Sequence, residues 1–389
     1  MPDSATIGQP QQLAPLPPVS RQHLDELSDQ IGIMQHAIGS QPDPAHGYCV
    51  DDVARALQVD LLHGRELGWA PVAERAWTNL RFLSTAFDAE IGGFRNFRRV
   101  DGSWLPGPSS DDSQARAMLA LGETIAAASD PRMVTFATAL FDQALPEAQR
   151  LPALRAQASV MLACDAVMRV APTGETARAY RLLAGRIRAI VGSRSGAAWP
   201  WPESVLTYEN ALPVRALIVA GQYLDAQPVI DAGLAILDWQ IAAQTTDTGH
   251  LSLIGNGWWP QDGEKSKFDQ QPIEATCLLL AAESAFEVSG FDRYRGVMEQ
   301  AYGWFRGEND LGMAVADPAR GACGDGLTPG GINTNEGAES TLMWLIALEH
   351  IRAMREGRAL PPPVAERRDG SASAGASPSV ERRAMAGIA

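Results

Sequence analysis

The sequence contains few of the residues that define disulfide-rich and metal-binding proteins. Its four cysteines, Cys49, Cys164, Cys277 and Cys323, are widely spaced and form no CxxC pair, so neither a disulfide framework nor a zinc site is predicted. We expect small buried side chains in a reducing compartment. Only His46, among six histidines, adjoins an acidic segment, which disfavours a histidine-based metal site. We therefore expect neither metal nor cofactor.

Other absences exclude membrane, secretory and nucleic-acid functions. No apolar run reaches about 18 residues, so no membrane span is predicted. The Pro/Gln-rich start, residues 1–20, lacks the basic-then-apolar pattern of a signal peptide, so a cytoplasmic location is expected. The net charge of -14 disfavours a nucleic-acid partner, which requires a basic surface. There is neither a GxSxG motif nor a phosphate-loop lysine, which disfavours a serine hydrolase of that type and a nucleotide-binding protein.

The apolar pattern predicts a series of helices that alternate between two kinds. Alanine-rich stretches such as 153–170 and 275–282 are apolar on most faces, as buried helices are, whereas their neighbours carry more charge. We predict about twelve helices in six pairs at intervals of roughly 45 to 65 residues, the first running from Ser20 to Ile38. The predicted fold is all-α, an (α/α)6 barrel with short β-hairpin loops on the active-site face. Residues 21–356 would form it, between a disordered lead-in (1–20) and a disordered tail (357–389).

The predicted loops are unequal in length. Links from an inner helix to the next outer helix are about three to nine residues long, whereas most links back to the next inner helix are much longer. Because long structured loops in compact domains are usually functional, we expect the site on the face where inner helices begin.

Carboxylates recur at these helix starts, in Asp51-Asp52, Asp111-Asp112, Glu209, Glu274 and the pair Glu336/Glu339. Capping explains one Asp at a helix start, but explains two consecutive ones less well. Helix N-termini favour anions by about 0.3–1 kcal/mol each, and mutual repulsion can raise the pKa of one carboxyl group. Arg55 and Arg116 are each interpreted as a same-helix partner of an Asp four residues earlier, and Asn335 as a helix cap.

The candidate site residues fall into two groups. The predicted catalytic residues are Asp52 and Asp112 first, then Glu209 and Glu336 as substitutes. Trp199 and Trp201 could form a stacking platform or pack as a loop plug. The predicted substrate-binding residues, which supply aromatic, amide and charged groups, are His46, Tyr48, Asp51, Asp111, Trp199, Trp201, Tyr208, Trp258, Trp259, Lys267, Gln270, Glu274, Asn333 and Glu339. The segment 92–104 is predicted to be a hairpin lining the same face.

The pattern resembles the (α/α)6 carbohydrate-active enzymes, which include inverting glycoside hydrolases, unsaturated glucuronyl hydrolases and sugar epimerases. The runs 46–57, 268–275 and 330–341 resemble glycosidase-like bacterial proteins found alongside glycosyltransferases. The resemblance implies an inverting glycoside hydrolase acting on an oligosaccharide or glycan. Two alternatives stay open: a sugar isomerase or epimerase, and a non-catalytic glycan-binding partner of a glycosyltransferase. A terpene cyclase is disfavoured by the polar loops.

Overall fold

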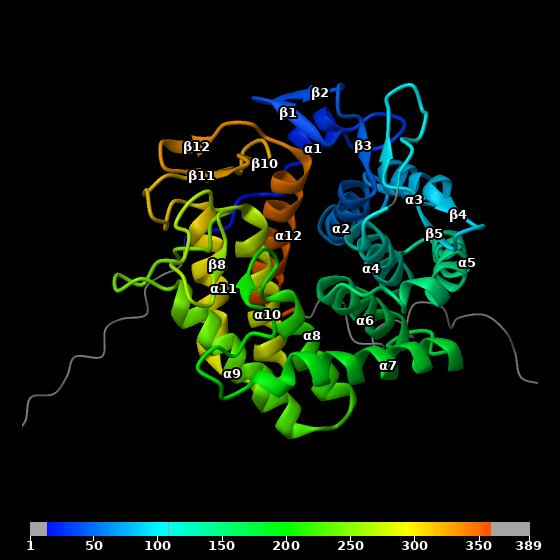
Figure 1. Ribbon diagram of the computed structural model, residues 1–389. Coiled ribbons are helices and arrows are strands. Elements are labelled where there is room, and N and C mark those ends of the chain that lie inside the picture. Colours follow the sequence, from blue (N-terminus) through cyan, green and yellow to red (C-terminus); the bar gives the residue numbers. More distant parts are fainter. Residues whose placement is uncertain (1–13, 108, 359–389) are drawn as a thin grey trace, which may run out of the picture.

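The computed structural model describes residues 14–107 and 109–358, and six of its helices form a closed inner ring. Each inner helix packs against the next around the ring, and the last contacts the first. Figure 1 shows them following one another around the barrel. They are α2 (Val50–Leu67), α4 (Asp111–Ala127), α6 (Leu154–Met168), α8 (Leu212–Tyr223), α10 (Pro272–Ser289) and α12 (Ala338–Arg355).

A second layer of helices packs outside the ring. Its members are α3 (Ala73–Ala86), α5 (Pro131–Ala148), α7 (Gly174–Ile190), α9 (Gln227–Gln244), α11 (Asp292–Phe305) and the short α1 (Gln22–Leu27), which lies against α12. A short 3-10 turn, η1 (Gly192–Arg194), follows α7. Inner α6 buries 13 of its 15 residues, whereas outer α7 buries six of 17. The predicted (α/α)6 barrel and its two kinds of helix are confirmed.

The loop asymmetry has the expected form. Links from inner to outer helices contain two to five residues. Links from outer helices to the next inner helix are long in five cases: 28–49, 87–110, 191–211, 245–271 and 306–337. The link into α6 is the short one among the described residues. The long links therefore emerge together where inner helices begin.

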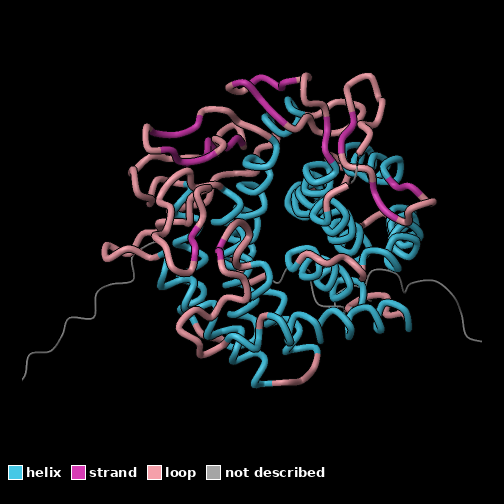
Figure 2. The backbone as a smooth tube through the Cα atoms, viewed as in Figure 1, coloured by secondary structure: helices cyan, strands magenta, loops and turns pink. Residues whose placement is uncertain are grey.

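Six antiparallel two-stranded ribbons form within these long links. They pair β1 (His36–Ile38) with β2 (Gln41–Asp43), β3 (Tyr48–Cys49) with β6 (Phe97–Arg98), β4 (Phe87–Asp88) with β5 (Gly93–Phe94), β7 (Val205–Leu206) with β8 (Trp259–Pro260), β9 (Ala316–Asp317) with β10 (Ala322–Cys323), and β11 (Gly326–Thr328) with β12 (Gly331–Asn333). Figure 2 shows the strands outside the helical ring, largely in the upper half of the view.

Two sequence-based predictions of local structure were wrong. The predicted helix from Ser20 to Ile38 ends at Leu27, and its last three residues form β1. The charge and glycine content of 28–35 favours turns instead, and the Asp29 carboxylate caps the backbone N–H groups of Ile31 and Gly32. Residues 92–104 do not form one hairpin, because β5 pairs with β4 while β6 pairs with β3. Only the second part of the segment folds back on itself, where Arg98 forms an antiparallel bridge with Trp104.

The backbones of inner helices α4 and α6 approach each other closely at small residues. A Cβ atom on Gly122 of α4 would lie 2.6 Å from the carbonyl oxygen of Ala163 on α6. Only glycine fits there without displacement of one helix. Elsewhere, Arg352 and Arg355 of α12 donate to the carbonyl groups of Pro17 and Ala14, so residues 14–17 lie against this helix.

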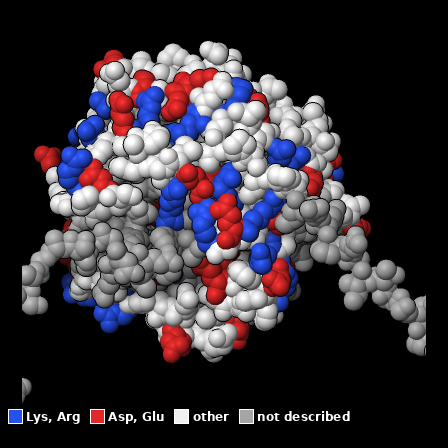
Figure 3. Space-filling model, turned by 180° about the vertical axis from the view of Figure 1, so that it is seen from behind, with Lys and Arg blue, Asp and Glu red and all other residues white. Residues whose placement is uncertain are grey.

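The protein surface mixes charges of both signs. Figure 3 shows the side opposite to Figure 1, where Lys and Arg intermingle with Asp and Glu around the middle of the face. Within the described ranges, no helix is long and apolar enough to cross a membrane.

Candidate active site

The paired aspartates lie in the first turns of neighbouring inner helices, but they do not cap them. Cys49 is the N-cap of α2, with its sulfur accepting from the Asp52 N–H group, and Ser110 is the N-cap of α4. Capping therefore does not explain the aspartates at these two helix starts. Residues just upstream satisfy the free N–H groups of the helix ends. This leaves the aspartate side chains available for contacts across the barrel.

Two largely buried arginines, Arg55 and Arg116, connect these helices. They lie beneath the mouth of the barrel, the end at which the inner helices begin, and we call them the arginine layer. Arg55 of α2 donates to Asp52 at 3.0 Å and to Glu339 of α12 at 2.8 Å. Arg116 of α4 binds Glu209 through both terminal nitrogens, at 2.9 and 2.6 Å, and lies 3.5 Å from Asp51. The predicted same-helix pairs four residues apart were wrong. Because both side chains point into the barrel, their partners come mainly from other inner-helix starts.

Three carboxylates around this arginine layer remain open to solvent. The side chains of Asp51 and Glu339 are 24% and 42% exposed. Asp112 is half-buried and accepts a 2.5 Å hydrogen bond from the exposed Tyr208 hydroxyl. The negative charges of Asp112 and Glu339 both raise the pKa of Asp51. Helices α2, α4 and α12 thus bring three accessible carboxylates together at one mouth.

Asp51 has an unusual environment within this group. One of its carboxylate oxygens is buried without a hydrogen-bond partner. Burial raises the pKa of Asp51, and the nearby arginines Arg116 and Arg55 only partly offset this effect. A carboxyl group with a raised pKa and partial exposure is suited to donate a proton.

Asp52 and Glu209 are buried in ion pairs instead. Asp52 is 3% exposed and accepts from the Cys49 thiol and from Arg55. Burial, only partly offset by Arg55, raises its pKa to about 6. For Glu209 burial alone would raise the pKa, but the Arg116 guanidinium outweighs burial and lowers it. Both side chains serve the arginine layer, so Asp51 is better placed than Asp52 to meet a substrate.

The backbone around Glu209 is held in a strained conformation. Its φ is +46°, in the left-handed region that few non-glycine residues adopt. The Glu274 carboxylate of α10 accepts from the Glu209 N–H group and, at 3.1 Å, from Asn210. Burial raises the pKa of Glu274 to about 7. Helix α8 begins only after this segment, at Leu212.

Arg155 of α6 contacts the segment before α8, although it was not among the residues predicted from the sequence. It donates to the Tyr208 carbonyl at 2.5 Å and to Thr207, and its guanidinium lies 4.7 Å from the Tyr208 ring centre. Cys277, also missed as a site residue, donates its thiol to Glu209. One signal could have identified Arg155: it is the first charged residue of the largely apolar stretch 153–168 and lies in the first turn of α6.

Several predicted site residues lie outside this cluster. Glu336 pairs with Arg320 at 3.0 Å, and the predicted cap Asn335 lies before α12, whose N-cap is Gly337. Asp111 accepts from the Ala153 N–H group, which fixes the start of α6. Tyr48 is buried and donates to Asp29.

The remaining polar candidates belong to the surrounding loops. His46 is exposed beside Asp43. Lys267 pairs with Asp310, which also accepts from the buried Gln270. The Asn333 side chain accepts from the Asn335 N–H group. These contacts stabilise the loops and do not reach the arginine layer.

Most of the tryptophans predicted to bind substrate are packed against other side chains instead. Trp199 and Trp201 are 7% and 0% exposed. The Trp199 ring contacts Trp259 and Trp239 edge-on at 5.3 Å, and these two stack on each other. Trp258, in contrast, is 45% exposed. Of the four tryptophans predicted to bind substrate, Trp258 presents the most open ring.

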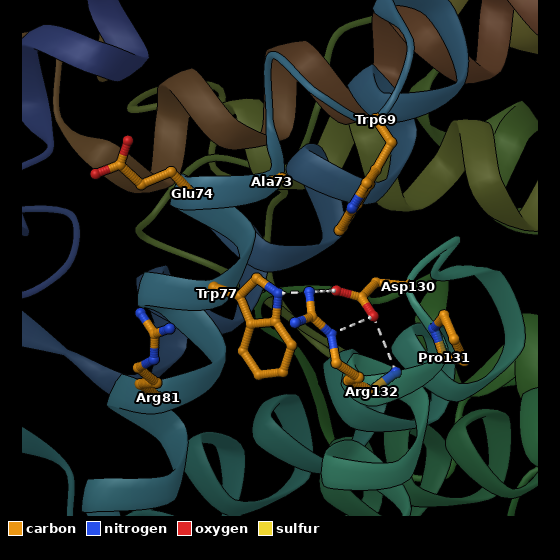
Figure 4. A pocket seen from close by; sticks show the side chains of 8 residues that line it. All are labelled: Trp69, Ala73, Glu74, Trp77, Arg81, Asp130, Pro131 and Arg132. Carbon is orange, nitrogen blue, oxygen red and sulfur yellow. Dashed lines mark hydrogen bonds and ion pairs between the residues drawn. The ribbon is translucent and has the colours of Figure 1, made fainter.

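A hollow lies on the outside of the barrel. Its volume is about 480 Å³, and it lies between α3 and the α4–α5 link. Figure 4 shows Trp77 beside Asp130 and Arg132. Asp130 accepts from the Trp77 ring N–H at 3.3 Å and from Arg132 at 2.8 Å. These contacts connect neighbouring outer helices, so we assign the hollow to packing rather than to the candidate site.

The described residues contain no group of three or more His, Cys, Asp or Glu side chains arranged to hold a metal ion. The cluster instead alternates carboxylates with guanidinium groups, and it can donate and accept protons without further ligands.

Comparison with known proteins supports the fold. No sequence family and no curated protein matches the chain. A sugar epimerase from a ruminal bacterium shares 14% identity over 85% of this chain and 97% of its own, with a TM-score of 0.66. Cellobiose 2-epimerase from Spirochaeta thermophila shares 17% identity over 86% and 95%, with a TM-score of 0.64. An α-1,6-mannanase of glycoside hydrolase family 76 from a Salegentibacter species shares 12% identity over 86% and 97%, with a TM-score of 0.59.

Proposed function

We propose that this protein is a carbohydrate-active enzyme that hydrolyses a glycosidic bond with inversion of configuration. The observation that carries the proposal is the pairing of two carboxyl groups in different environments at one mouth. Asp51 has a raised pKa and a buried, unpartnered oxygen, whereas Asp112 is fixed by the Tyr208 hydroxyl. Such a difference separates a proton donor from a proton acceptor.

In this mechanism Asp51 is the general acid and Asp112 the general base. Asp51 would protonate the leaving glycosidic oxygen as the bond to the anomeric carbon breaks. Asp112 would remove a proton from a water molecule that attacks the opposite face of the sugar. Tyr208 would orient the Asp112 carboxylate by its hydrogen bond, while Arg116 would stabilise Asp51 once it has lost its proton. Glu339 and the exposed Trp258 would contact the bound glycan.

An epimerase or isomerase is the second candidate, because three structural neighbours with high coverage are described as epimerases and one as a mannose isomerase. That chemistry moves a proton to and from a sugar carbon and requires a base beside it. In the described part of the chain, no hydrogen bond or ion pair joins a histidine to Arg55, Arg116 or their carboxylate partners. The carboxylate pair therefore favours hydrolysis. A non-catalytic glycan-binding protein is the third candidate.

One experiment separates the three. The wild-type protein is incubated with a panel of neutral oligosaccharides in deuterated water, and the products are identified by mass spectrometry and NMR. Hydrolysis yields shorter sugars without deuterium on carbon. Epimerisation or isomerisation yields sugars of unchanged length that carry deuterium on carbon, and a binding protein leaves every sugar unchanged.

Two neighbouring variants assign the activity to the mouth. Asp112→Asn should reduce turnover by about 10²- to 10⁴-fold, the usual contribution of a general base. Asp111→Asn is the matched control, because its side chain contacts only the start of α6 among the described residues. It should keep wild-type turnover. Equal losses in both variants would contradict the proposed role of Asp112.

A further inference from the structure

A cavity lies inside the inner ring beneath the arginine layer. Its volume is about 330 Å³, and side chains from all six inner helices line it. On α2 the lining extends from Arg55 to Arg65. Ten residues of helix rise by roughly 15 Å, so the cavity follows the barrel axis toward the end opposite the candidate active site. We call it the axial chamber.

Aliphatic side chains form one part of the lining of the axial chamber, and charged and polar side chains form the rest. The apolar lining residues are Leu61, Leu62, Leu119, Ala126, Ala127, Leu162, Ala166, Leu212, Val219, Leu280, Met343 and Ile346. No Phe, Tyr or Trp side chain is among the lining side chains of the described residues. Sugars bind preferentially against aromatic faces, so these walls are better suited to a saturated hydrocarbon chain than to a glycan.

The charge of the chamber also differs from that of the mouth. Five arginines and four carboxylates line it. Burial raises the pKa of two of these carboxyl groups, Glu123 and Glu287, and the Arg215 guanidinium opposes this effect. The chamber therefore presents more cationic and hydrogen-bond-donating groups than anionic ones, and it favours an anionic ligand.

Arg215 is the best-placed anchor for an anion. Its Nε donates to the Ser284 hydroxyl at 3.2 Å. Among the described residues, the carboxylates of Glu123 and Glu287 interact with it electrostatically, without a direct ion pair. The lining residues Arg169 and His350, in contrast, already pair with Asp165 and Glu283 at 2.7 Å. At the inner end of the chamber, the buried Arg55 has an Nε without a hydrogen-bond partner.

We infer that the axial chamber binds a small aliphatic monocarboxylate, with its carboxylate on Arg215 and Ser284 and its chain along the leucine-lined wall. A guanidinium group binds a carboxylate through two parallel hydrogen bonds. Burial of the chain against the leucine side chains removes apolar surface from water and so favours binding. The occupied chamber would lie directly below Arg55 and Arg116, which position the carboxylates of the mouth. This inference does not depend on hydrolysis.

The test uses octanoate as the probe and measures its binding to the intact protein by calorimetry and by thermal unfolding. Octan-1-ol and octylamine have the same chain without the carboxylate. Octanoate should bind and raise the unfolding temperature, and both analogues should bind at least tenfold more weakly, since a charged hydrogen bond contributes about 1.5–3 kcal/mol. Equal binding of all three, or no binding of octanoate, would overturn the inference.

Two arginine variants locate the site. Arg215→Gln should weaken octanoate binding by about 10- to 100-fold, whereas Arg169→Gln should leave it close to wild type because Arg169 is already paired with Asp165. Circular dichroism verifies that each variant is folded, and Arg215→Lys replaces Arg215→Gln if the latter is not. Unchanged binding in the folded Arg215 variant would place octanoate elsewhere and overturn the inference. None of these measurements requires turnover, so they are independent of the proposed hydrolysis.

Discussion

The Tyr208 hydroxyl donates a 2.5 Å hydrogen bond to Asp112, although 96 residues separate the two in the sequence. The contact joins the long loop before α8 to the first turn of α4. It fixes the orientation of one of the three accessible carboxylates at the mouth. A carboxylate held in this way can accept a proton without first having to reorient.

We predict that Tyr208→Phe lowers kcat by about tenfold with a smaller effect on KM, because one orienting hydrogen bond is lost. Tyr48→Phe is the matched control, since Tyr48 makes a hydrogen bond of the same length to Asp29 within the core. That variant should lower the unfolding temperature and leave kcat unchanged. Steady-state kinetics on a hydrolysed oligosaccharide tests both. An equal loss of kcat in the two variants would refute an orienting role for Tyr208.

The adjacent residues Asp51 and Asp52 should respond differently to the same change. Asp51→Asn should abolish most turnover and leave the fold intact, because the side chain is partly exposed and has an unpartnered oxygen. Asp52→Asn should destabilise the protein by about 3–5 kcal/mol, as expected when a buried ion pair loses one partner. Urea unfolding and activity measured on both variants test this. Full activity in Asp51→Asn would contradict its assignment as the acid.

Glu274 should make stability depend on pH. Its pKa is raised from 4.5 to about 7, mainly by burial, so the folded state binds more protons than the unfolded state between these values. The stability that Glu274 contributes is therefore complete below about 4.5 and is lost as the pH rises toward 7. Relative to Glu274→Gln, the wild-type protein should lose on the order of 1–3 kcal/mol between pH 5 and pH 8. Parallel pH profiles of the two proteins would contradict this.

Two glycine substitutions should have opposite effects on stability, because one glycine lies at a helix contact of the inner ring and the other on an open face of an outer helix. Gly122→Ala should destabilise the protein by about 1–3 kcal/mol, because the new methyl group would collide with the Ala163 carbonyl. Gly185→Ala lies in α7, where a Cβ atom meets nothing within 4 Å. It should stabilise the protein by about 0.4–1 kcal/mol by restricting the unfolded chain. Chemical unfolding of both variants measures the contrast, and a destabilised Gly185→Ala would contradict it.

Much of the barrel was predictable because burial patterns and loop lengths are encoded locally. Stretches apolar on most faces became the inner helices, and the long links emerged where those helices begin. The first helix was mispredicted because Asp29 and Gly32 favour a turn that the spacing of apolar residues does not register.

The meeting of the acidic helix starts at one end of the barrel was also predictable, but the pairings of their side chains were not. The acidic helix starts indicated which ends of the helices to examine. Which of Asp51 and Asp52 faces solvent depends on the N-cap at Cys49, since that cap sets the rotation of the first turn. Arg116 pairs with Glu209, 93 residues away, and spacing within one helix cannot reveal such a contact.

The anomeric configuration of the first-formed product tests the central claim most directly. Proton NMR of the anomeric signal, recorded before mutarotation, follows the cleavage of an oligosaccharide of known linkage. If Asp51 and Asp112 act as acid and base, the new reducing end appears with the configuration opposite to that of the cleaved bond, and the signal is lost in Asp112→Asn. A product that retains the original configuration would contradict the inverting mechanism.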